Sequence, residues 1–265
     1  MKLKDKVVLV TASTRGIGLA AVKACAEEGA IVYMAARNLE RAGEEAAQLN
    51  ARGMRVSCVY NDAGVRESFT TMVDEVVRET GRIDVLVNNF GTSNRGKDLD
   101  FTNTDAEVFL ETGSTNLASV YLASQAAVKH MASQGGGSII NISSVSGLVP
   151  DISQVAYGTS KAAINYLTRL IAVQEAANHI RCNAILPGMT ATAAVEKHLT
   201  GEFRDLFLRH IPLNRMADPR EIAAAVVYFA SDESAYTTGQ LLAVSGGFGL
   251  ATPVYGDLAH RENRR

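Results

Sequence analysis

The chain has 265 residues, a formal net charge of −2 and a pI of about 6.2, which give no electrostatic reason to expect binding to nucleic acid. It contains no apolar run long enough to cross a bilayer and no charged-then-apolar leader, so we expect a cytoplasmic protein without a membrane partner. Its three cysteines form no CxxC pair and its five histidines no HxxH pattern, so no metal site is expected.

Short runs rich in β-branched residues recur along the chain and predict strands. They cover residues 6–12, 30–35, 55–60, 83–89, 138–143, 180–186 and 240–246. The first five are almost continuously apolar, which is typical of strands covered on both faces. The segments between them have helical periodicity, as in residues 17–28 and 65–79. This alternation, with no linker to divide it, predicts one α/β domain over residues 1–265, a Rossmann-type doubly wound parallel sheet of about seven strands with helices on both faces.

Two segments depart from the alternation. Residues 190–217 follow a strand but are longer than a crossover needs, and residues 250–265 form a C-terminal tail that begins apolar and ends charged. A long insertion after the carboxyl end of a strand is where a substrate lid would lie. A peripheral helix pair explains residues 190–217 equally well from their position alone.

The turn after the first predicted strand has the composition of a phosphate-binding turn. Small residues between a strand and a helix expose backbone N–H groups at the helix N-terminus, where a phosphate can bind. The residues of this candidate site are Ser13, Thr14, Arg15, Gly16, Ile17 and Gly18. Ala12 stands where such turns usually carry glycine, and an alanine is tolerated there if its φ is negative.

The end of the second predicted strand indicates which dinucleotide is preferred. A site for NAD usually presents a carboxylate here to the ribose hydroxyls, but this chain has Ala36 followed by Arg37. Arg15 in the preceding turn supplies a second guanidinium. Two arginines and no acid favour the 2′-phosphate of NADP(H) over NAD(H), although solvated surface charge is the simpler interpretation of either arginine alone.

Tyr157 and Lys161 are four residues apart at the start of a predicted helix, so they share one face. In isolation, a packed aromatic and a solvated lysine explain this spacing. Ser144 follows the fifth predicted strand, thirteen residues before Tyr157, and Asn116 lies in the helical stretch before that strand. An ammonium about 4 Å from the phenol, at an effective dielectric constant near 20, would lower the phenol pKa by roughly three pH units toward the range of a working acid/base.

In combination these motifs resemble those of the classical short-chain dehydrogenases/reductases, over residues 5–250. The matching features are the TxxxRGIG turn, Asp62, NNxG at 88–91, Asn116, Ser144, YxxxK and Pro187–Gly188. The resemblance implies that Tyr157 is the general acid/base and that Lys161 lowers its pKa and holds the nicotinamide ribose. It also implies that Ser144 hydrogen-bonds the substrate oxygen, with Ser143 as a rival, and that Asn116 sustains a proton-relay water.

The resemblance extends to the cofactor. It implies that Asp62 contacts the adenine and that Asn88 contacts the adenosine ribose. It further implies that the nicotinamide is lined by Ile185, Pro187, Gly188, Thr190 and Thr192, with Thr190 or Thr192 bonded to its carboxamide. Phe90 departs from the family pattern, in which alanine is usual at this place in the NNxG motif.

Longer phrases resemble a narrower group within the family, the NADP-dependent 7-alpha-hydroxysteroid dehydrogenases of bile-acid-transforming anaerobes. These phrases are NNFGTSN, NISSVSGLVPDISQVAYGTSKAAINYLT, IRCNAILPGMTAT and SGGFGLATPVYGDL. The resemblance implies reversible oxidation of the 7-alpha-hydroxyl of a bile acid or steroid to the 7-ketone. Such a substrate needs an elongated apolar cleft with a polar rim.

Candidate residues for that cleft follow from their positions in the chain. Ser144 and Tyr157 would bind the reacting oxygen, and Thr92 and Asn94 would form the polar rim. Apolar walls would come from Met189, Val195 and Leu199, together with Leu148, Val149, Ile152 and Phe203. Packing of the lid on the sheet is the alternative explanation for these apolar residues.

Two other functions fit part of the pattern. One is another short-chain ketoreductase that acts on a 3-oxoacyl thioester or a small ketone, and the other is a non-catalytic nucleotide-sensing protein on the same fold. The four residues Asn116, Ser144, Tyr157 and Lys161 argue against the second, because a binding module needs no such set. Members of the family are usually tetramers, and the small residues of the helices near 104–133 and 154–177 suit close packing, so we expect a homotetramer.

Overall fold

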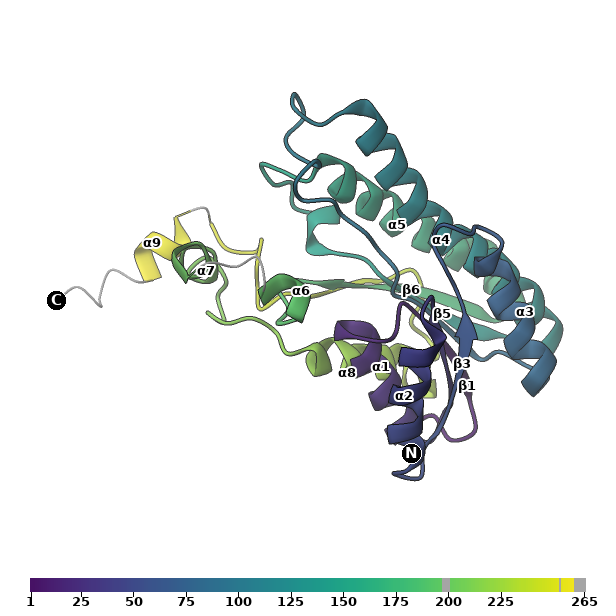
Figure 1. Ribbon diagram of the computed structural model, residues 1–265. Helices are drawn as coiled ribbons and strands as arrows, with labels where there is room; N and C mark the ends of the chain where they lie inside the picture. Colours follow the sequence, from purple (N-terminus) through teal and green to yellow (C-terminus); the bar gives the residue numbers. More distant parts are fainter. Residues whose placement is uncertain (197–200, 253, 260–265) are drawn as a thin grey trace.

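The strands predicted from the sequence form one parallel sheet in the computed structural model, which describes residues 1–196, 201–252 and 254–259 (Figure 1). Across the described residues the strand order is β3-β2-β1-β4-β5-β6-β7, and every neighbouring pair is parallel. The bounds are β1 Val7–Thr11, β2 Ile31–Ala36, β3 Arg55–Tyr60, β4 Val85–Asn88, β5 Gly137–Ile142, β6 Ile180–Pro187 and β7 Leu241–Val244. The direction of winding reverses between β1 and β4, so the predicted doubly wound fold is confirmed.

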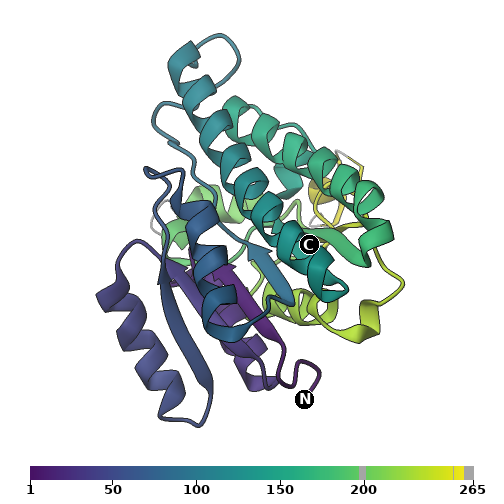
Figure 2. The ribbon, with the colours of Figure 1, turned by 90° about the vertical axis from the view of Figure 1, so that its right-hand side faces the viewer.

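Helices cover both faces of the sheet. Figure 1 shows α1, α2 and α8 on one face and α3, α4 and α5 on the other. Their bounds are α1 Gly16–Glu27, α2 Leu39–Asn50, α3 Ser68–Thr80, α4 Ala106–Gln134, α5 Val155–Gln174 and α8 Pro219–Ala230. The two long helices α4 and α5 lie side by side in both ribbon views (Figures 1 and 2).

Two apolar cores result, one on each face of the sheet. Along β1, Val8 and Val10 pack with residues of α1 and α8, whereas Val7 and Leu9 pack with residues of α3 and α4. Successive side chains of a strand point to opposite faces, so one short apolar run contributes to both cores. All of β1 is buried, as expected for a central strand of a parallel sheet.

Strand β3 differs from the prediction that each of the first five runs is covered on both faces. Arg55, Ser57 and Tyr60 are exposed, because β3 pairs only with β2 and forms an edge of the sheet. Its apolar residues Val56 and Val59 are still buried. Charged side chains on an edge strand discourage pairing with other chains, which explains Arg55 in an otherwise apolar run.

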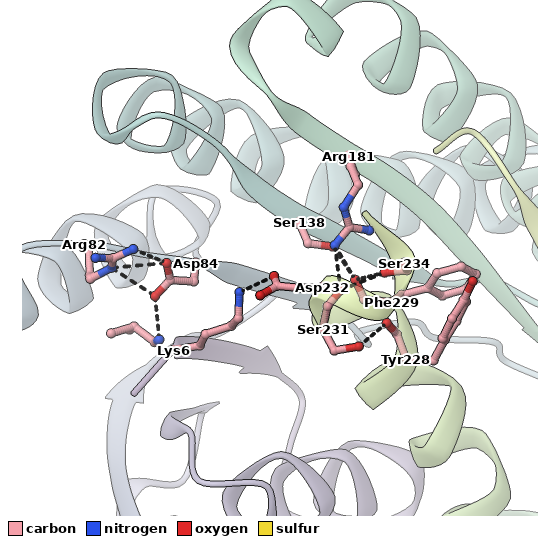
Figure 3. Close-up of polar contacts among 11 residues, drawn as sticks. Lys6, Arg82, Asp84, Ser138, Arg181, Tyr228, Phe229, Ser231, Asp232 and Ser234 are labelled. Atoms are coloured by element: carbon pink, nitrogen blue, oxygen red, sulfur yellow. Dashed lines mark hydrogen bonds and ion pairs between the residues drawn. The ribbon is translucent and has the colours of Figure 1, made fainter. Parts of the chain in front are cut away.

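A polar network lies at the N-terminal ends of the strands (Figure 3). Arg82 binds Asp84, and Asp84 Oδ2 also accepts a backbone hydrogen bond from the start of β1 at 2.8 Å. Lys6 pairs with Asp232 at 2.8 Å, and Arg181 donates to carbonyl oxygens at the end of α8 at 2.9 and 3.3 Å. A cation at a helix C-terminus complements the helix dipole. Ligands of doubly wound folds bind at the C-terminal ends of the strands, so we infer that this network stabilises the fold rather than binding a ligand.

Backbone hydrogen bonds join the start and the end of the insertion after β6. The N–H of Ala191 donates to the carbonyl of Ala217 at 2.8 Å, and the N–H of Ala217 donates to the carbonyl of Met189 at 2.9 Å. Between these points lie α6 Ala193–Glu196 and α7 Gly201–Leu208, and α9 Tyr255–Ala259 packs beside α7 (Figure 1). Short 3-10 helices occupy η1 Val145–Gly147, η2 Ala176–Asn178 and η3 Asp232–Ser234.

Candidate active site

The carboxyl ends of the strands open into a cleft of about 630 Å³. Its walls are the segments after β4, β5 and β6, the first turns of α5, and the insertion that contains α6 and α7. Ser144, Tyr157 and Lys161 all line this cleft. The cleft therefore lies where doubly wound folds bind their ligands.

Tyr157 and Lys161 share a face of α5, as their spacing predicts. Lys161 is 2% exposed, and its ammonium donates a hydrogen bond to the carbonyl of Ile142 at 2.9 Å. The Nζ atom lies 5.5 Å from the centroid of the Tyr157 ring. A solvated surface lysine, the alternative for this spacing, is thereby excluded.

The pKa values of this pair are set mainly by burial. Burial raises the pKa of Tyr157, and a hydrogen bond with Ser144 and the positive charge of Arg95 oppose that rise more weakly. Burial also lowers the pKa of Lys161 to about 8. Burial thus dominates the pKa of the phenol, and the lowering of that pKa by Lys161, whose ammonium donates to the carbonyl of Ile142, stays a prediction.

The two candidate serines after β5 differ in their hydrogen bonds. Ser143 is buried, and its hydroxyl donates to the carbonyl of Lys161 at 3.2 Å. Ser144 Oγ accepts hydrogen bonds from the N–H of Ser146 at 3.2 Å and from its hydroxyl at 2.8 Å. The proton of Ser144 is therefore free to be donated toward Tyr157 and the cleft.

Asn116 is completely buried in α4 and does not line the cleft. Its Oδ1 accepts from the N–H of Thr92 at 2.8 Å, and its Nδ2 donates to the carbonyl of Thr92 at 2.9 Å. A third bond joins Nδ2 to the hydroxyl of Ser160 at 3.0 Å. The carboxamide therefore fixes the segment after β4 against α5, and its role in holding a relay water stays a prediction.

Asp98, which no sequence motif indicates, caps the helix that carries the tyrosine. Its carboxylate is 0% exposed and accepts hydrogen bonds from the N–H groups of Ala156 at 2.8 Å and Tyr157 at 2.9 Å. Gln154, at the N-cap position, has a φ of +61° and makes no side-chain cap. No local signal reveals this cap, because the capping residue lies more than fifty residues before the helix.

The turn between β1 and α1 has the geometry of a phosphate cradle, with one departure from the prediction. Gly16 has a φ of +54°, and a Cβ on Gly18 would lie 2.6 Å from both the carbonyl oxygen of Ala12 and Nδ2 of Asn89. Ala12 itself has a φ of +50°, whereas we expected a negative value. The turn demands the left-handed conformation at this position, so the alanine adopts it despite its Cβ.

The side chains of this turn face different ways. Ser13 is buried and donates to the carbonyl of Ala35 at 3.3 Å, whereas Thr14 is half-buried and Arg15 is exposed. Ile17 lines the cleft. Arg37 is exposed just beyond β2, so both predicted arginines are available to a ligand.

The two acceptors predicted on the adenosine side have different environments. Asp62 is half-buried, and its Oδ1 accepts from the N–H of Gly64 at 2.9 Å. Asn88 is buried, and its Nδ2 donates to Ser124 at 3.0 Å and to Asn141 at 2.9 Å. The side chain of Asn88 therefore ties β4 to β5 and α4, and the neighbouring Asn89 lines the cleft instead.

Of the five residues predicted to surround the nicotinamide, four lie together at the cleft, whereas Ile185 is buried in a core on one face of the sheet and does not line it. Pro187, Gly188, Thr190 and Thr192 all line the cleft. Thr190 is buried and donates to the carbonyl of Gly188 at 3.1 Å. A Cβ on Gly188 would lie 2.8 Å from Cα of Ser245, so only glycine fits between β6 and the segment after β7.

The apolar wall of the cleft is partly as predicted and partly aromatic. Met189, Val195, Val149 and Phe203 line it as expected. Phe207 and Phe248, which were not predicted as wall residues, also line it and stack with ring centroids 5.2 Å apart. Leu199 lies outside the described residues. Their position on the cleft wall is compatible with both explanations of these apolar residues, a substrate wall and packing of the lid on the sheet.

Two other predicted wall residues lie elsewhere. Leu148 and Ile152 are 53% and 89% exposed and line a separate surface groove. That groove has a volume of about 310 Å³ and shares part of the segment that connects β5 to α5 with the cleft. They are thus not part of the cleft wall.

The polar rim of the cleft is displaced by one residue from the prediction. Neither Thr92 nor Asn94 lines the cleft, whereas Ser93 and Arg95 do. Asn116 binds both backbone groups of Thr92, and we attribute the choice of residues that face the cleft to this contact. The signal for this choice is nonlocal, because Asn116 lies on the following helix.

Across residues 1–196, 201–252 and 254–259 no cluster of His, Cys, Asp and Glu side chains could hold a metal ion. Within the same ranges no helix has both the length and the apolar character required to cross a bilayer.

Comparison with known proteins places these features in context. The family model described as "Enoyl-(Acyl carrier protein) reductase" matches residues 11–249. The "7alpha-hydroxysteroid dehydrogenase" of Clostridium sardiniense is 49% identical over 260 residues, which cover 98% of this chain and 99% of that protein. The protein of the same name from Paraclostridium sordellii is 47% identical over 97% of this chain and 96% of its own length.

A solved structure shares the fold over nearly the whole chain. It is a gluconate 5-dehydrogenase from Burkholderia cenocepacia J2315 in complex with NADP and tartrate. The TM-score is 0.89 at 28% identity, and the match covers 95% of this chain and 98% of that one.

Proposed function

The chain belongs to the short-chain dehydrogenase/reductase family, and from this premise we propose that it oxidises the 7-alpha-hydroxyl of bile-acid steroids reversibly to the 7-ketone with NADP(H). Identities of 49% and 47% to two 7alpha-hydroxysteroid dehydrogenases support the choice of substrate. The observation that carries the proposal is the convergence of Ser144, Tyr157 and Lys161 on one largely apolar cleft. Phe207 and Phe248 give this cleft a flat aromatic wall that suits a rigid alicyclic substrate.

The proton of the reacting hydroxyl is assigned to Tyr157. In the oxidative direction the phenolate accepts that proton, and in the reductive direction the phenol returns it to the ketone oxygen. Ser144 donates a hydrogen bond to the same oxygen, since its own acceptor positions are filled by Ser146. Because burial raises the pKa of Tyr157, oxidation is expected to accelerate as the pH rises.

The residues that would hold the cofactor fit a dinucleotide. When bound, the nicotinamide supplies the carbon that accepts or donates the hydride. The β1–α1 turn offers backbone N–H groups to the phosphates, and its Gly18 leaves no room for a side chain between the turn and Asn89. Thr190 and Thr192 line the cleft beside Pro187, where a carboxamide would be bound.

The preference for NADP(H) over NAD(H) rests on charge. Arg15 and Arg37 are exposed beside the end of β2, where Ala36 stands in place of an acid. Arg37→Asp is expected to lower kcat/KM for NADP by at least about tenfold relative to NAD, because it removes one bidentate phosphate contact and adds a repelling charge. Arg52→Asp, at the far end of α2, is the matched control. An unchanged NADP/NAD ratio in Arg37→Asp would contradict the assignment.

A substrate panel tests the proposed activity. Cholate and chenodeoxycholate should reduce NADP when added to the wild-type chain, and the product should be the 7-ketone by mass spectrometry and NMR. Turnover of a 3-oxoacyl thioester without oxidation of either steroid would favour the other ketoreductase activity.

Tyr157→Phe should lower kcat by about 10²–10⁴-fold while NADP binding persists. Steroid oxidation at the wild-type rate by Tyr157→Phe would exclude the proposed mechanism, and binding of NADP without any turnover would favour a nucleotide sensor.

We further propose a cytoplasmic homotetramer. Cys25, Cys58 and Cys182 are free, as expected in a reducing compartment. The outer faces of α4 and α5 carry large exposed apolar side chains, including Leu110, Tyr166 and Val173 at 66%, 65% and 78% exposure. Apolar faces of this kind on two adjacent helices suit burial between subunits.

A further inference from the structure

Ser146 lies between the reacting end of the cleft and a second cavity. It lines both the cleft and the surface groove of about 310 Å³. Ser144 and Tyr157 line the cleft but not the groove. Ser146 is half-buried and belongs to η1, which follows Ser144 and precedes the helix that carries Tyr157. A hydroxyl at this position can contact the proton-transfer residues on one side and solvent on the other.

Hydrogen bonds run in one direction from Ser146 toward Tyr157. The hydroxyl of Ser146 donates to Oγ of Ser144 at 2.8 Å, and the N–H of Ser146 donates to the same atom at 3.2 Å. The proton of Ser144 is then left to be donated onward, and a hydrogen bond joins Ser144 to Tyr157. Hydroxyls bonded in series can pass a proton along the series, because each oxygen can accept one proton as it releases another.

Helix α5 holds η1 in place. A Cβ on Gly147 would lie 2.8 Å from the backbone carbonyl carbon of Lys161, so this segment packs directly on the helix. Nδ2 of Asn165 donates to the carbonyl of Gly147 at 3.2 Å. Tyr157 lies on the same helix, so one rigid element positions both Ser146 and the tyrosine.

The groove offers a route to solvent that a bound substrate leaves open. Leu148 and Ile152 on its wall are largely exposed. Among the described residues, the charged side chains that line it are Asp100 and Asp151, and no cation lines it. Carboxylates on a cavity wall favour the entry of positive charge, protons included. Substrate and cofactor would fill the cleft and exclude water from Tyr157 on that side, so a proton can arrive from the groove.

A relay water held by Asn116 is the alternative route. Both polar atoms of the Asn116 carboxamide are bonded, to Thr92 and to Ser160. The backbone carbonyl of Asn116 also accepts a hydrogen bond, from the hydroxyl of Ser119 at 2.8 Å. A water held there would have to share these groups. The hydroxyl of Ser146 has no such competitor on its way to Ser144, so the geometry favours the route through the groove.

We propose that Ser146 passes protons between solvent in the groove and Tyr157, through Ser144. In the reductive direction, Tyr157 gives its proton to the ketone oxygen and becomes a phenolate. The hydroxyl of Ser144 then turns from the new alcohol to the phenolate, gives it a proton and takes one from Ser146. Ser146 takes a proton from hydronium or protonated buffer in the groove, so each reduction consumes one solvent proton. Oxidation runs the same transfers in reverse.

This inference rests on the proposed function in that Tyr157 is the acid/base, and it holds for whichever ketone the chain reduces. Ser146 acts through Ser144 and is therefore a positioning residue as well as a proton carrier. The experiment has to separate these two roles.

Removal of the Ser146 hydroxyl tests the relay. Ser146→Ala keeps the backbone N–H that bonds Ser144 and should lower kcat for ketone reduction by at least about tenfold, with little change in KM. Reprotonation of Tyr157 then limits the rate, so the solvent isotope effect on kcat in D₂O should rise, and the isotope effect of NADPH deuterated at the transferred position should fall. Imidazolium, a small acid that can enter the groove, should restore kcat in proportion to its concentration.

Two matched variants complete the series. Ser146→Thr keeps a hydroxyl and should recover most of kcat without added imidazolium. Thr159→Val removes a hydroxyl that lines the groove but not the cleft, and it should leave kcat and both isotope effects unchanged. Asn116→Ala tests the alternative route, and imidazolium should not restore its kcat.

The outcomes separate this inference from the proposed function. A chain that reduces another ketone but no 7-ketosteroid contradicts the proposed substrate, and the relay is then decided on that ketone. A chain that reduces no ketone overturns both proposals. Unchanged kcat in Ser146→Ala overturns the relay. A lower kcat with neither imidazolium rescue nor a larger solvent isotope effect shows that Ser146 only positions Ser144, and rescue of Asn116→Ala alone assigns the relay to the water; either result also overturns it.

Discussion

At Ala12 the backbone adopts a conformation that its side chain disfavours. The φ of +50° places the alanine in the left-handed region, where a Cβ costs about 1–2 kcal/mol and glycine has no such penalty. Ala12→Gly should therefore raise the free energy of unfolding by about 0.5–1 kcal/mol, after the larger unfolded-state entropy of glycine is subtracted. Urea denaturation measures this change. Ala20→Gly in the middle of α1 is the control and should be destabilising, and equal losses in both variants would refute the strain at Ala12.

Burial of the Lys161 ammonium lowers the stability of the folded chain, although the proposed chemistry uses this residue. Its pKa falls from 10.5 to about 8 on folding, so the unfolded chain binds more protons between these values and stability rises with pH across that window. This lowering of the Lys161 pKa corresponds to a destabilisation of about 3 kcal/mol, which is present in full below pH 8. The hydrogen bond to the carbonyl of Ile142 offsets about 1 kcal/mol of that destabilisation.

At pH 7 the free energy of unfolding of Lys161→Met should therefore be about 1–2 kcal/mol higher than that of the wild-type chain, with a correspondingly higher melting temperature, while activity is lost. The gain should shrink as the pH approaches 10. Calorimetry at pH 7 and pH 9.5 tests this, with the exposed Lys129→Met as the control. A variant that is less stable at pH 7 would show that the lysine is not a buried charge.

Single residues also mark the limit of what the sequence reveals about the site. The spacing of Ser144, Tyr157 and Lys161 predicts the group that lines the cleft, because a helix repeat and a strand end fix where such side chains lie. The choice of Ser93 and Arg95 over Thr92 and Asn94 has no local cause. A residue on the next helix sets it, and only the folded chain brings that residue to the segment.

Helix α5 depends on a cap that comes from a distant part of the chain. Asp98→Ala removes the acceptor for two N–H groups in the first turn of this helix and should lower the free energy of unfolding by about 2 kcal/mol. Because the same turn carries Tyr157, kcat should fall as well. Asp98→Asn keeps one oxygen acceptor and should recover part of both losses.

Asp105→Ala is the matched control for this cap. Asp105 caps α4, where its carboxylate accepts from the N–H of Glu107 at 2.7 Å. The control should lower stability and leave kcat unchanged, and urea denaturation with steady-state kinetics reports both quantities. If kcat per folded molecule were equal in the two alanine variants, Asp98 would be a structural cap without a positioning role.

The positions of the strands in the sequence were easier to predict than the order of the strands in the sheet. The seven β-branched runs coincide with the strands, because propensity and burial act within a few residues. That the third strand would lie at an edge could not be predicted, since strand order is decided by crossovers between distant segments. The exposed side chains of Arg55 and Ser57 are consistent with that edge only in retrospect.

The molecule as a whole presents an apolar surface along α4 and α5 that we expect a second copy of the chain to cover. At 28.2 kDa per chain, a homotetramer should have a mass of roughly 113 kDa by light scattering. Val173→Glu places a charge among these exposed side chains and should shift the mass toward smaller species. Arg52→Glu, in the turn after α2 and so on the opposite face of the sheet, is the control. A monodisperse monomer in the wild-type chain would contradict the proposed assembly.

The packing of α9 on α7 has a practical consequence for which terminus should carry a tag, a fusion partner or the link to a solid support. Asp257 lies 3.8 Å from Arg209, and the backbone at Gly256 leaves no room for a side chain beside His210. Phe207, on the same α7, is part of the wall that faces the substrate. The N-terminus lies far from α9 and α7 (Figure 1), and Lys2 near that terminus pairs with Glu233, so we expect a fusion partner ahead of Met1 to disturb the wall less than one joined after α9. Immobilisation on a support, or coupling to an enzyme that regenerates the cofactor, is therefore best made through the N-terminus.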